Sequence, residues 1–519
     1  MSNPINRKLL LLLSFIEGGS VMACELIGAK LLAPYFGTSL YVWAAALALT
    51  LGGLTLGYFI GGRLSQKYAG NFRLLYYVIL IASILLIIMP FTSDIIMELA
   101  INLSLEMGAI FSLMIFMMPP LAFMGMVSPI IINLLTDNKE SAGNNAGTVY
   151  AISTLGGILY TFLMGFIIIP SFGLTYPAII SGLILAIIPL LLLMRKKDSK
   201  ALIVLIAVML SCAASVLPRF EYNDEYKILY QSEGILGQVK VVDHPSYDIT
   251  SDNRIGRALL VNNTLQTYVG HEDEFKYSIW AWSHYFPTAA SILPAGSDVL
   301  LLGLGGGTIV KQLDRLGYNV DVVEIDERIR DVSFEYFNLD PLTNVIIDDA
   351  RHFIKTCTKK YDLVIFDTFL SESVPEHLLT IEGFEDTKKI LKPEGMIMSN
   401  FYGYINGEKG LAAKSVYKTF EKSGFNVDLL ATPGEEENRN LIFIASLVEK
   451  DFMLADYSEP NYERIKNLYE FFIDKRFLKL DDAIVLSDKK PRLSKLYNSA
   501  AREWKKNYNN YYRKHFIEE

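Results

Sequence analysis

The pattern of apolar and polar positions divides the chain near residue 217. Before this point, long apolar runs alternate with short polar breaks, and most runs are long enough for the ~20 residues that a membrane-crossing helix requires. The runs cover roughly 9–33, 40–62, 74–93, 107–134, 146–169, 174–194 and 201–217. After it, charged and apolar residues mix as in a soluble protein. The pattern predicts a multi-pass α-helical membrane domain over 1–217, with about seven to eight spans, fused to a soluble part.

The first apolar run carries charged residues that a bilayer core disfavours. Glu17 and Glu25 lie eight residues apart and share a helix face, and Lys30 follows them. Each charge costs about 2.5–3.5 kcal/mol at mid-depth, so such groups usually face a bundle interior or a cavity. The two carboxylates could bind a cation such as a polyamine, or pair with Lys30 or Arg63 as structural contacts. Glu17 and Glu25 are therefore a candidate cation site within the membrane.

The soluble part begins with strands and continues with alternating strands and helices. Over 219–285, runs of β-branched residues alternate with turn signals. This pattern predicts a small antiparallel β lobe, and we expect this domain to extend over 218–290. Strands near 298–302, 320–325, 344–350, 361–369 and 395–401 then alternate with helices. This alternation predicts a doubly wound, Rossmann-like α/β domain over 291–450. Residues 451–519 are expected to form a C-terminal helical extension.

A glycine-rich turn follows the first strand of this sheet. Its glycines let the backbone approach a ligand where a Cβ would clash. They are Gly303, Gly305, Gly306 and Gly307, and a helix is expected from Ile309 to Leu316. Glu324 ends the next strand about 20 residues on, where an acid can accept hydrogen bonds from a ribose, and Asp326 lies just beyond it. The combination predicts a nucleoside site, and a tight turn in another kind of α/β protein is the alternative.

Acidic residues also end two later strands, at the edge where such sheets bind ligands. Asp349 could accept from an adenine amine, or it could, like Asp348, simply cap the next helix. Asp367 could hold or deprotonate an amine nucleophile, or stand in water as an ordinary loop residue. His352 and His377 lack a matching nucleophile, and we interpret both as structural or surface residues.

Composition argues against other classes of function. The net charge of −8 is modest, and no basic stripe alternates with aromatic residues in the soluble part, which argues against a nucleic-acid partner. The cysteines, Cys24, Cys212 and Cys357, lie far apart and offer neither a disulfide framework nor a metal-ligand cluster. We therefore expect no metal.

Together, these residues resemble the spermidine synthase family of aminopropyltransferases, specifically its membrane-fused bacterial branch. LYQSEGILGQVKVVD at 229–243 and LLVNNTLQTYVGHEDEFKY at 259–277 are similar to the family's β lobe, including Gln266 and Asp273-Glu274. LLLGLGGGT, VVEID, DDARHF and YDLVIFDTF follow in the family's order. The stretch from ELIGAK to YFIGGR is similar to the membrane part of the fused branch, and VLSDKKP at 485–491 is loosely similar to the family's TDD-x-AP segment.

The resemblance implies a fold of the S-adenosylmethionine-methyltransferase type and assigns roles to individual residues. The glycine turn and Glu324 would hold the nucleoside and ribose of the donor, Asp349 would read its adenine, and Asp367 would serve the incoming amine. The other expected donor-binding residues are Gln266, Asp326 and Ala350.

Departures from the family concern mainly the acceptor side. The family carries GGGDGG, whereas here the turn is GLGGGT and Gly306 replaces the acid. The family's DSSDP has two acids, whereas here Asp367 remains and Leu370 replaces the second. Burying an ammonium without a carboxylate is costly, so the acceptor site is not built for putrescine. Glu372, Glu376 or the membrane acids could substitute.

The leading hypothesis is a membrane-bound transferase that moves an aminopropyl group from decarboxylated S-adenosylmethionine to an amine or lipid-borne acceptor. Catalysis would come mainly from positioning for in-line attack, with Asp367 orienting the nucleophile or taking its proton. Glycine at 306 removes a repulsion against a donor carboxylate, so an S-adenosylmethionine-dependent methyltransferase is an alternative. A polyamine transporter or sensor with a nucleoside-binding domain is another, and a homodimer stays open.

Loop charges and the expected donor disagree on orientation in the cell membrane. With seven spans, the basic loops lie on the amino-terminal side, which the positive-inside rule makes cytoplasmic, and the soluble domain emerges outside. An eighth crossing or a re-entrant stretch within Ile95–Pro129, interrupted by three prolines, would place it inside. Because adenosyl donors are intracellular, we predict a cytoplasmic soluble domain.

Overall fold

The computed structural model describes most of the chain in two compact units. The described residues are 7–37, 40–100, 103, 105–136, 138–216, 226–234, 236–245, 255–271, 274–368, 375–460, 462, 464–501 and 503. One unit is Met1–Glu221 with Ser232–Gln238, and the other is Tyr222–Gln231 with Val239–Glu519.

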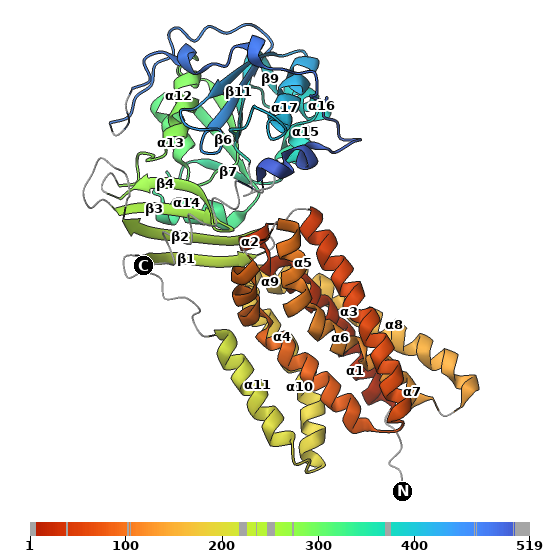
Figure 1. Cartoon of the computed structure of the whole chain (residues 1–519). Coiled ribbons are helices and arrows are strands. Elements are labelled where there is room, and N and C mark those ends of the chain that lie inside the picture. Colours follow the sequence, from red (N-terminus) through yellow and green to blue (C-terminus); the bar gives the residue numbers. More distant parts are fainter. Residues whose placement is uncertain are drawn as a thin grey trace. The chain divides into compact units, whose positions relative to one another are not determined.

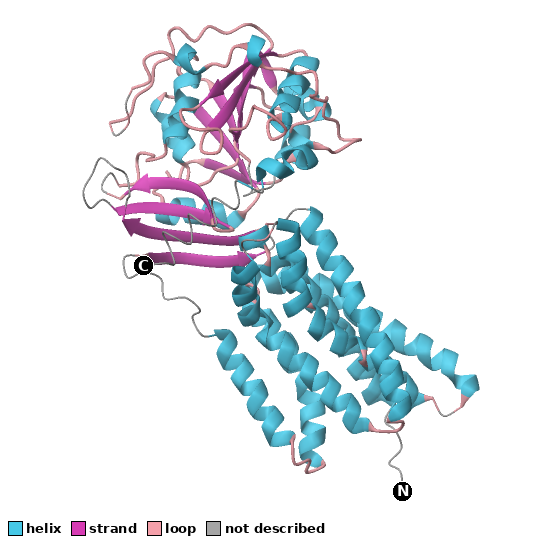
Figure 2. Ribbon diagram, in the orientation of Figure 1, coloured by secondary structure: helices cyan, strands magenta, loops and turns pink. Residues whose placement is uncertain are grey.

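Apart from the strand residues within Ser232–Gln238, the described part of the first unit is built of helices (Figures 1 and 2). They are α1 (Arg7–Leu31), α2 (Ala33–Phe36), α3 (Leu40–Lys67), α4 (Phe72–Ala100), α5 (Leu105–Phe116), α6 (Met118–Gly125), α7 (Val127–Leu135), α8 (Lys139–Leu163), α9 (Ile169–Phe172), α10 (Thr175–Arg195) and α11 (Ala201–Val216). Among the described residues, six helical stretches are long and apolar enough to cross a membrane: Arg7–Phe36, Tyr41–Lys67, Phe72–Ala100, Met118–Leu135, Glu140–Phe172 and Thr175–Arg195.

Two of the seven predicted spans differ from this set. The stretch 107–134 is divided into α5, α6 and α7, because Pro119 and Pro120 fall in the first turn of α6 and Pro129 falls in the first turn of α7, where a missing N–H costs least. Helix α11 has 16 residues, about 24 Å, which is shorter than the ~30 Å core of a bilayer. The number of crossings therefore stays a prediction.

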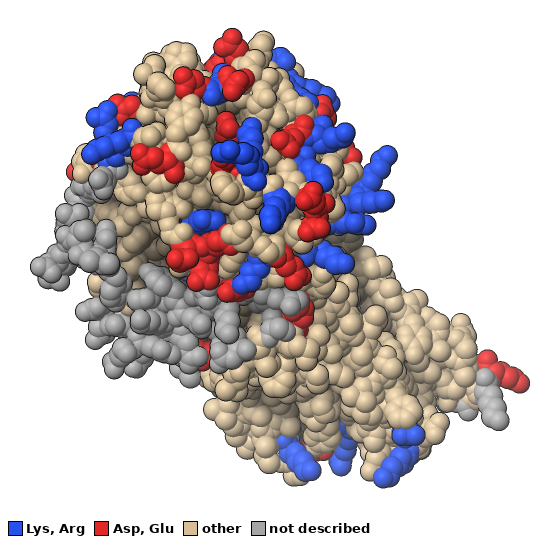
Figure 3. Space-filling model, turned by 45° about the horizontal axis from the view of Figure 1, so that its top comes forward, with Lys and Arg blue, Asp and Glu red and all other residues tan. Residues whose placement is uncertain are grey.

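Close packing and an apolar exterior characterise this unit. A Cβ on Gly18 of α1 would lie 2.0 Å from the Ser153 carbonyl oxygen of α8, so the two helices touch through their backbones. Large apolar side chains such as Leu51, Phe166 and Ile203 are exposed. In Figure 3 the visible face of the helical unit carries charged side chains only towards its ends, whereas both signs mix over the second unit. This distribution is typical of a lipid-facing surface.

The β lobe is a four-stranded sheet in the order β1-β2-β3-β4. Its strands are β1 (Lys227–Gly234), β2 (Gly237–Pro245), β3 (Ile255–Val261) and β4 (Thr264–Gly270). Asn262 and Asn263 join β3 and β4 with φ angles of 51° and 59°. Asparagine tolerates this left-handed conformation, which two-residue hairpin turns require.

The second sheet has seven strands in the order β10-β11-β9-β8-β5-β6-β7. Its elements are α12 (Tyr285–Ala290), β5 (Asp298–Leu302), α13 (Thr308–Arg315), β6 (Asn319–Glu324), α14 (Glu327–Tyr336), β7 (Asn344–Ile347), α15 (Ala350–Thr356), β8 (Tyr361–Phe366), α16 (Ile381–Lys389), β9 (Leu391–Tyr402), α17 (Leu411–Lys422), β10 (Asn426–Ala431) and β11 (Asn440–Ser446). Strands β5 to β9 pair in parallel, and β11 is antiparallel to both neighbours. The predicted Rossmann-like, methyltransferase-type fold is confirmed.

Strand β5, at the centre of this sheet, contributes side chains to the apolar clusters on both faces of the sheet. Leu300 and Leu302 belong to one apolar cluster, and Val299 and Leu301 belong to the other. All four side chains are buried because helices cover both faces, which explains the unbroken apolar run in the sequence. The chain order reverses between β5 and β8, so a crevice is expected at their carboxyl ends.

The C-terminal segment differs from the helical extension expected over 451–519. Within its described part, residues 451–491 form turns and the 3-10 helices Leu468–Phe471 and Lys475–Phe477, and α-helix begins only at Leu493. The segment bonds to the sheet instead, because the Ile473 N–H donates to the Leu429 carbonyl at 2.8 Å. It thus covers part of the edge strand β10.

Candidate active site

A pocket of about 720 Å³, measured with its open mouth, lies at the carboxyl ends of β5, β6, β7 and β8. The β lobe contributes one wall through Leu259, Val261 and Gln266. The predicted site residues that line the pocket are Gln266, Gly303, Gly305, Glu324, Asp349, Ala350 and Asp367.

The glycine turn brings backbone directly against the neighbouring strand end. Gly303 has a φ of +92°, and a Cβ there would lie 2.1 Å from the carbonyl oxygen of Asp367. Gly305 is also left-handed, with a φ of +54°. Side chains are excluded at Gly303, so the end of β5 lies open as a backbone surface for a flat ligand.

Glu324 is fixed beneath this turn. Its carboxylate accepts hydrogen bonds from the backbone N–H groups of Leu304 and Asp326, both at 2.9 Å. The side chain is buried, and this burial raises the pKa of Glu324 to about 7, against the opposing effect of the two N–H donors. A carboxylate held in this way can accept further hydrogen bonds from ribose hydroxyls.

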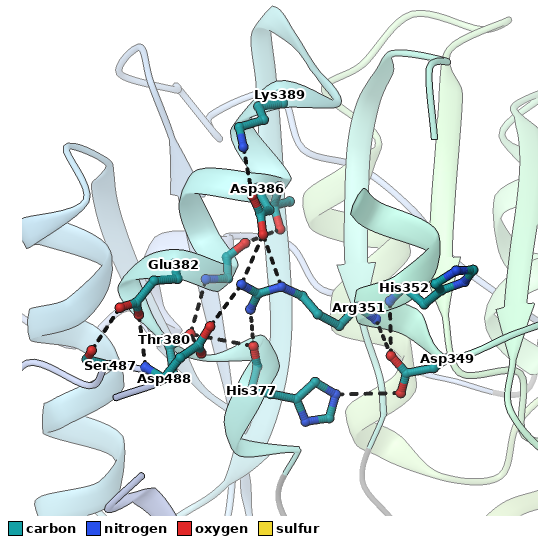
Figure 4. Close-up of polar contacts among 12 residues, drawn as sticks. Asp349, Arg351, His352, His377, Thr380, Glu382, Asp386, Lys389, Ser487 and Asp488 are labelled. Carbon is teal, nitrogen blue, oxygen red and sulfur yellow. Dashed lines mark hydrogen bonds and ion pairs between the residues drawn. The ribbon is translucent and has the colours of Figure 1, made fainter. Parts of the chain in front are cut away.

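Asp349 serves two purposes at once. Its Oδ1 accepts from the N–H groups of Arg351 and His352, at 2.9 and 3.0 Å, and so caps α15. Its Oδ2 lies 3.6 Å from Nε2 of His377, another residue of the pocket wall (Figure 4). The capping alternative is therefore correct for one oxygen, and the other remains available to a ligand.

Asp367 lies at the pocket end of β8. Its Oδ1 accepts from Nδ2 of Asn400 at 2.9 Å. Burial raises the pKa of Asp367 to about 6, although the hydrogen bond from Asn400 opposes this rise. Asp367 is thus a stronger base than an exposed aspartate while still ionised at neutral pH.

Three of the residues expected to bind the donor do not line the pocket and instead stabilise the backbone near it. They are Gly306, Gly307 and Asp326. Gly306 faces Thr267 and Phe337, and a Cβ there would lie 2.7 Å from Thr267 Cγ2 and 2.9 Å from the Phe337 ring. Gly307 precedes α13 with a φ of +76°. Asp326 caps α14 and pairs with Arg328 at 2.6 Å.

Sequence reasoning missed a network around Arg351, which Figure 4 shows. The buried guanidinium pairs with Asp386 at 3.0 Å and Asp488 at 3.2 Å, and it donates to the carbonyl of His377. Thr380 also donates to Asp488, at 2.6 Å. Asp488 belongs to the VLSDKKP stretch, so the C-terminal segment fixes the pocket wall that carries His377. The DDARHF motif contains Arg351, but no pattern in the sequence indicates that Arg351 contacts His377. From the sequence alone, His377 is interpreted as a structural or surface residue.

Of the acids proposed to substitute on the acceptor side, Glu372 lies outside the described residues. Asp273 of the β-lobe pattern and Leu370, which replaces the family's second acid, also lie outside them. Glu376, in the 3-10 helix η3 (Glu376–Leu378), accepts from the Leu493 N–H at 3.1 Å. Among the described residues, no group of three or more His, Cys, Asp or Glu side chains could hold a metal ion.

The membrane acids are both buried within α1. Glu17 is 2% exposed and accepts from Ser153 Oγ at 3.1 Å, and Glu25 is 8% exposed. Of the cations considered as partners, Lys30 lies over the Trp43 ring at 5.3 Å and Arg63 over the Phe59 ring at 3.9 Å.

The sheet order and the pocket define the class as a Rossmann-like domain of the methyltransferase type, with its ligand site at the strand ends. Residues 287–433 match the spermine/spermidine synthase domain. This region of the chain is thus similar to the spermine/spermidine synthase domain, in agreement with the family that its motifs predicted.

Sequence relatives agree with this assignment. A polyamine aminopropyltransferase of Vibrio vulnificus is 36% identical over 190 residues, which is 34% of this chain and 61% of that protein. One of Thermoplasma volcanium is 30% identical over 185 residues, which is 34% of this chain and 66% of that protein. The chain thus spans less than two thirds of the length of each. A spermidine synthase structure from Thermotoga maritima aligns with 51% of this chain and 96% of its own, at 16% identity and a TM-score of 0.39.

Proposed function

We propose that the chain transfers the aminopropyl group of decarboxylated S-adenosylmethionine to an amine acceptor at this pocket. The match of residues 287–433 to the spermine/spermidine synthase domain supports the class of reaction. The choice of donor rests on the charge of the pocket. Among the described residues, the ionisable side chains that line it are those of Glu324, Asp348, Asp349, Asp367 and His377, and none is a lysine or arginine. The decarboxylated donor has a sulfonium and an ammonium, whereas S-adenosylmethionine adds a carboxylate that an acidic pocket disfavours.

The pocket residues divide the work of this reaction. Glu324 accepts from the ribose hydroxyls and Asp349 Oδ2 accepts from the adenine amine, which leaves the sulfonium end beside Asp367. The amine nitrogen attacks the carbon next to sulfur, the carbon–sulfur bond breaks with its electrons on sulfur, and 5′-methylthioadenosine leaves. Asp367 orients the amine and takes the proton that it loses. Catalysis thus rests on positioning and on a base of suitable pKa.

We propose an acceptor other than putrescine, because the position of the family's first acid is filled. Thr267 and Phe337 occupy the space beside Gly306, so a side chain at 306 would clash with both unless they moved. A monoamine or a lipid-borne amine needs fewer carboxylates than a diamine. A homodimer also remains a proposal.

We further propose that the helical unit is embedded in the cell membrane, with the soluble domain in the cytoplasm. Six apolar helices of sufficient length support the first statement, and the intracellular donor supports the second.

The test is product analysis with the full-length chain in detergent. We expect 5′-methylthioadenosine from the decarboxylated donor and an amine, and no S-adenosylhomocysteine from S-adenosylmethionine. S-adenosylhomocysteine alone would favour the methyltransferase alternative, and the absence of both products across a panel of amines would contradict transfer.

A substitution at Asp367 tests the proposed base. Asp367→Asn keeps the shape and loses the charge, so turnover should fall by ~10²-fold or more while 5′-methylthioadenosine affinity stays within about threefold. Asp362→Asn is the matched control, because Asp362 lies at the other end of β8 and pairs with Lys392 at 2.7 Å. Equal turnover in both variants would mean that Asp367 is an ordinary strand-end residue.

A further inference from the structure

Asp367 ends a chain of side-chain amides that crosses three strands. Asn400 on β9 donates Nδ2 to Asp367 Oδ1 at 2.9 Å, and Asn440 on β11 donates Nδ2 to Asn400 Oδ1 at 2.9 Å. Asn440 is itself fixed, because its N–H donates to Oγ1 of Thr432 at 2.8 Å. Neither asparagine is among the residues that line the pocket, and Asn400 is linked to the pocket through its hydrogen bond to Asp367.

The direction of this chain follows from what each group can donate. A side-chain amide has one donor end and one acceptor end, whereas an ionised carboxylate only accepts. Asn440 occupies the oxygen of Asn400 with a donor, so Asn400 has only its NH₂ to offer Asp367. A reversed Asn400 would place two oxygens face to face unless Asp367 carried a proton. The arrangement therefore matches the ionised form of Asp367.

We propose that Asn440 and Asn400 are positioning residues that keep Asp367 ionised and its second oxygen directed into the pocket. This inference rests on the proposed role of Asp367 as the base of the transfer. Burial alone would raise the pKa of Asp367 further, and the donated hydrogen bond from Asn400 limits that rise.

Other titratable groups face the same pocket from neighbouring elements. Glu324 comes from β6, Asp348 and Asp349 lie between β7 and α15, and His377 comes from η3. Asp367 itself follows β8 and touches Gly303 after β5. A pH profile of the wild type therefore reports several groups, and only the difference between variants isolates Asp367.

Asn440→Asp reverses the chain. The new carboxylate accepts from the NH₂ of Asn400, which turns its oxygen towards Asp367, and Asp367 must then bind a proton to donate back. The acidic limb of kcat/KM should move up by about one pH unit or more from the pKa of about 6, so kcat/KM falls about fivefold or more at pH 6 and about twofold or more at pH 7, and it recovers to within about threefold at pH 9. Affinity for 5′-methylthioadenosine should stay within about threefold.

Asn438→Asp is the matched control, because Asn438 is exposed and its replacement adds the same negative charge two residues from position 440. Its pH profile should follow the wild type. Asn400→Leu removes the donor at similar volume and should shift the profile in the same direction as Asn440→Asp. The affinity of the decarboxylated donor between pH 5 and 9, measured by calorimetry, should show the same shift, since its ammonium needs an ionised partner.

Two outcomes would overturn the relay. One is a uniform loss of turnover at all pH values with weaker nucleoside binding in Asn440→Asp, which a structural role would produce. The other is a profile equal to that of the control in both turnover and donor binding. If the wild type transfers no aminopropyl group, the proposed function fails, and the pH dependence of donor binding still decides whether Asn440 acts on Asp367.

Discussion

Replacement of Glu324 by glutamine tests the nucleoside site most directly. Glutamine keeps the size and loses the charge, while one of the two backbone N–H groups of Leu304 and Asp326 would face its NH₂. Hydrogen bonds to a charged group contribute about 1.5–3 kcal/mol, so the Kd of 5′-methylthioadenosine should rise roughly 10- to 150-fold. The loss should appear in affinity because the proposed role of Glu324 is to contact the nucleoside, the part of the donor that does not react.

The raised pKa of Glu324 adds a pH signature. With a pKa of about 7 in the folded protein, the group is neutral below pH 7 and a charged acceptor above it, so nucleoside affinity should rise between pH 6 and 8. The unfolded pKa is near the ordinary 4.5, and a folded pKa above this value means that the native state holds the proton more tightly. Its contribution to stability is thus complete below about pH 4.5 and is lost as pH rises through 7.

Calorimetry on the full-length chain at pH 6 and 8 measures both effects. Glu327→Gln is the control, because Glu327 is exposed in the first turn of α14 and pairs only with Arg330 among the described residues. Glu324→Gln should lose both the affinity and its pH dependence. A folded Glu324→Gln variant whose Kd stays within about threefold of the wild type at both pH values would refute the ribose assignment.

Further predictions concern the acceptor side, the C-terminal segment and the membrane. Gly306→Asp restores the family's acid but forces a Cβ within 3 Å of Thr267 and Phe337, so it should cost about 1–3 kcal/mol of stability in thermal melts without conferring putrescine turnover; such turnover would show that the space can open. Asp488→Asn should weaken 5′-methylthioadenosine binding about threefold to tenfold by loosening Arg351, and unchanged binding would limit the network to stability. Reporter fusions at 138, 198 and 519 should place the carboxyl terminus in the cytoplasm, and activity only as a periplasmic reporter there would contradict this. Glu17→Gln and Glu25→Gln should alter acceptor turnover or polyamine distribution across the membrane without changing donor binding; wild-type behaviour in both assays would make the acids structural.

The sequence was sufficient to predict that the strand-end acids and the glycine turn meet at one pocket, because the determinants are local. Glu324, Asp349 and Asp367 each end an apolar strand, and parallel strands of one sheet present their carboxyl ends at one edge. The glycine turn needs no distant partner to be recognised. These residues therefore meet in the pocket as their positions predicted, although their chemical roles stay predictions.

The remaining features depend on contacts that no local pattern encodes. The surroundings of Gly306 are set by Thr267 in the β lobe, 39 residues earlier. The pocket wall that carries His377 is fixed by Asp488, which accepts a hydrogen bond from Arg351 and lies 137 residues after it in the sequence. The segment 451–491 was wrongly expected to be helical because its length and polarity do not reveal that its backbone bonds to a sheet edge.

The pocket acids show why structural and chemical interpretations of one carboxylate need not compete. A carboxylate has two oxygens and about four acceptor positions. In Asp349 one oxygen caps α15, and in Asp367 one oxygen takes the amide of Asn400. Each anchor fixes the second oxygen before any ligand arrives, which lowers the ordering cost of binding and of reaction. A site whose acids are held in this way suits the doubly cationic donor that we propose, because it does not rely on mobile side chains. The remaining parts of the chain must then provide the recognition of the acceptor.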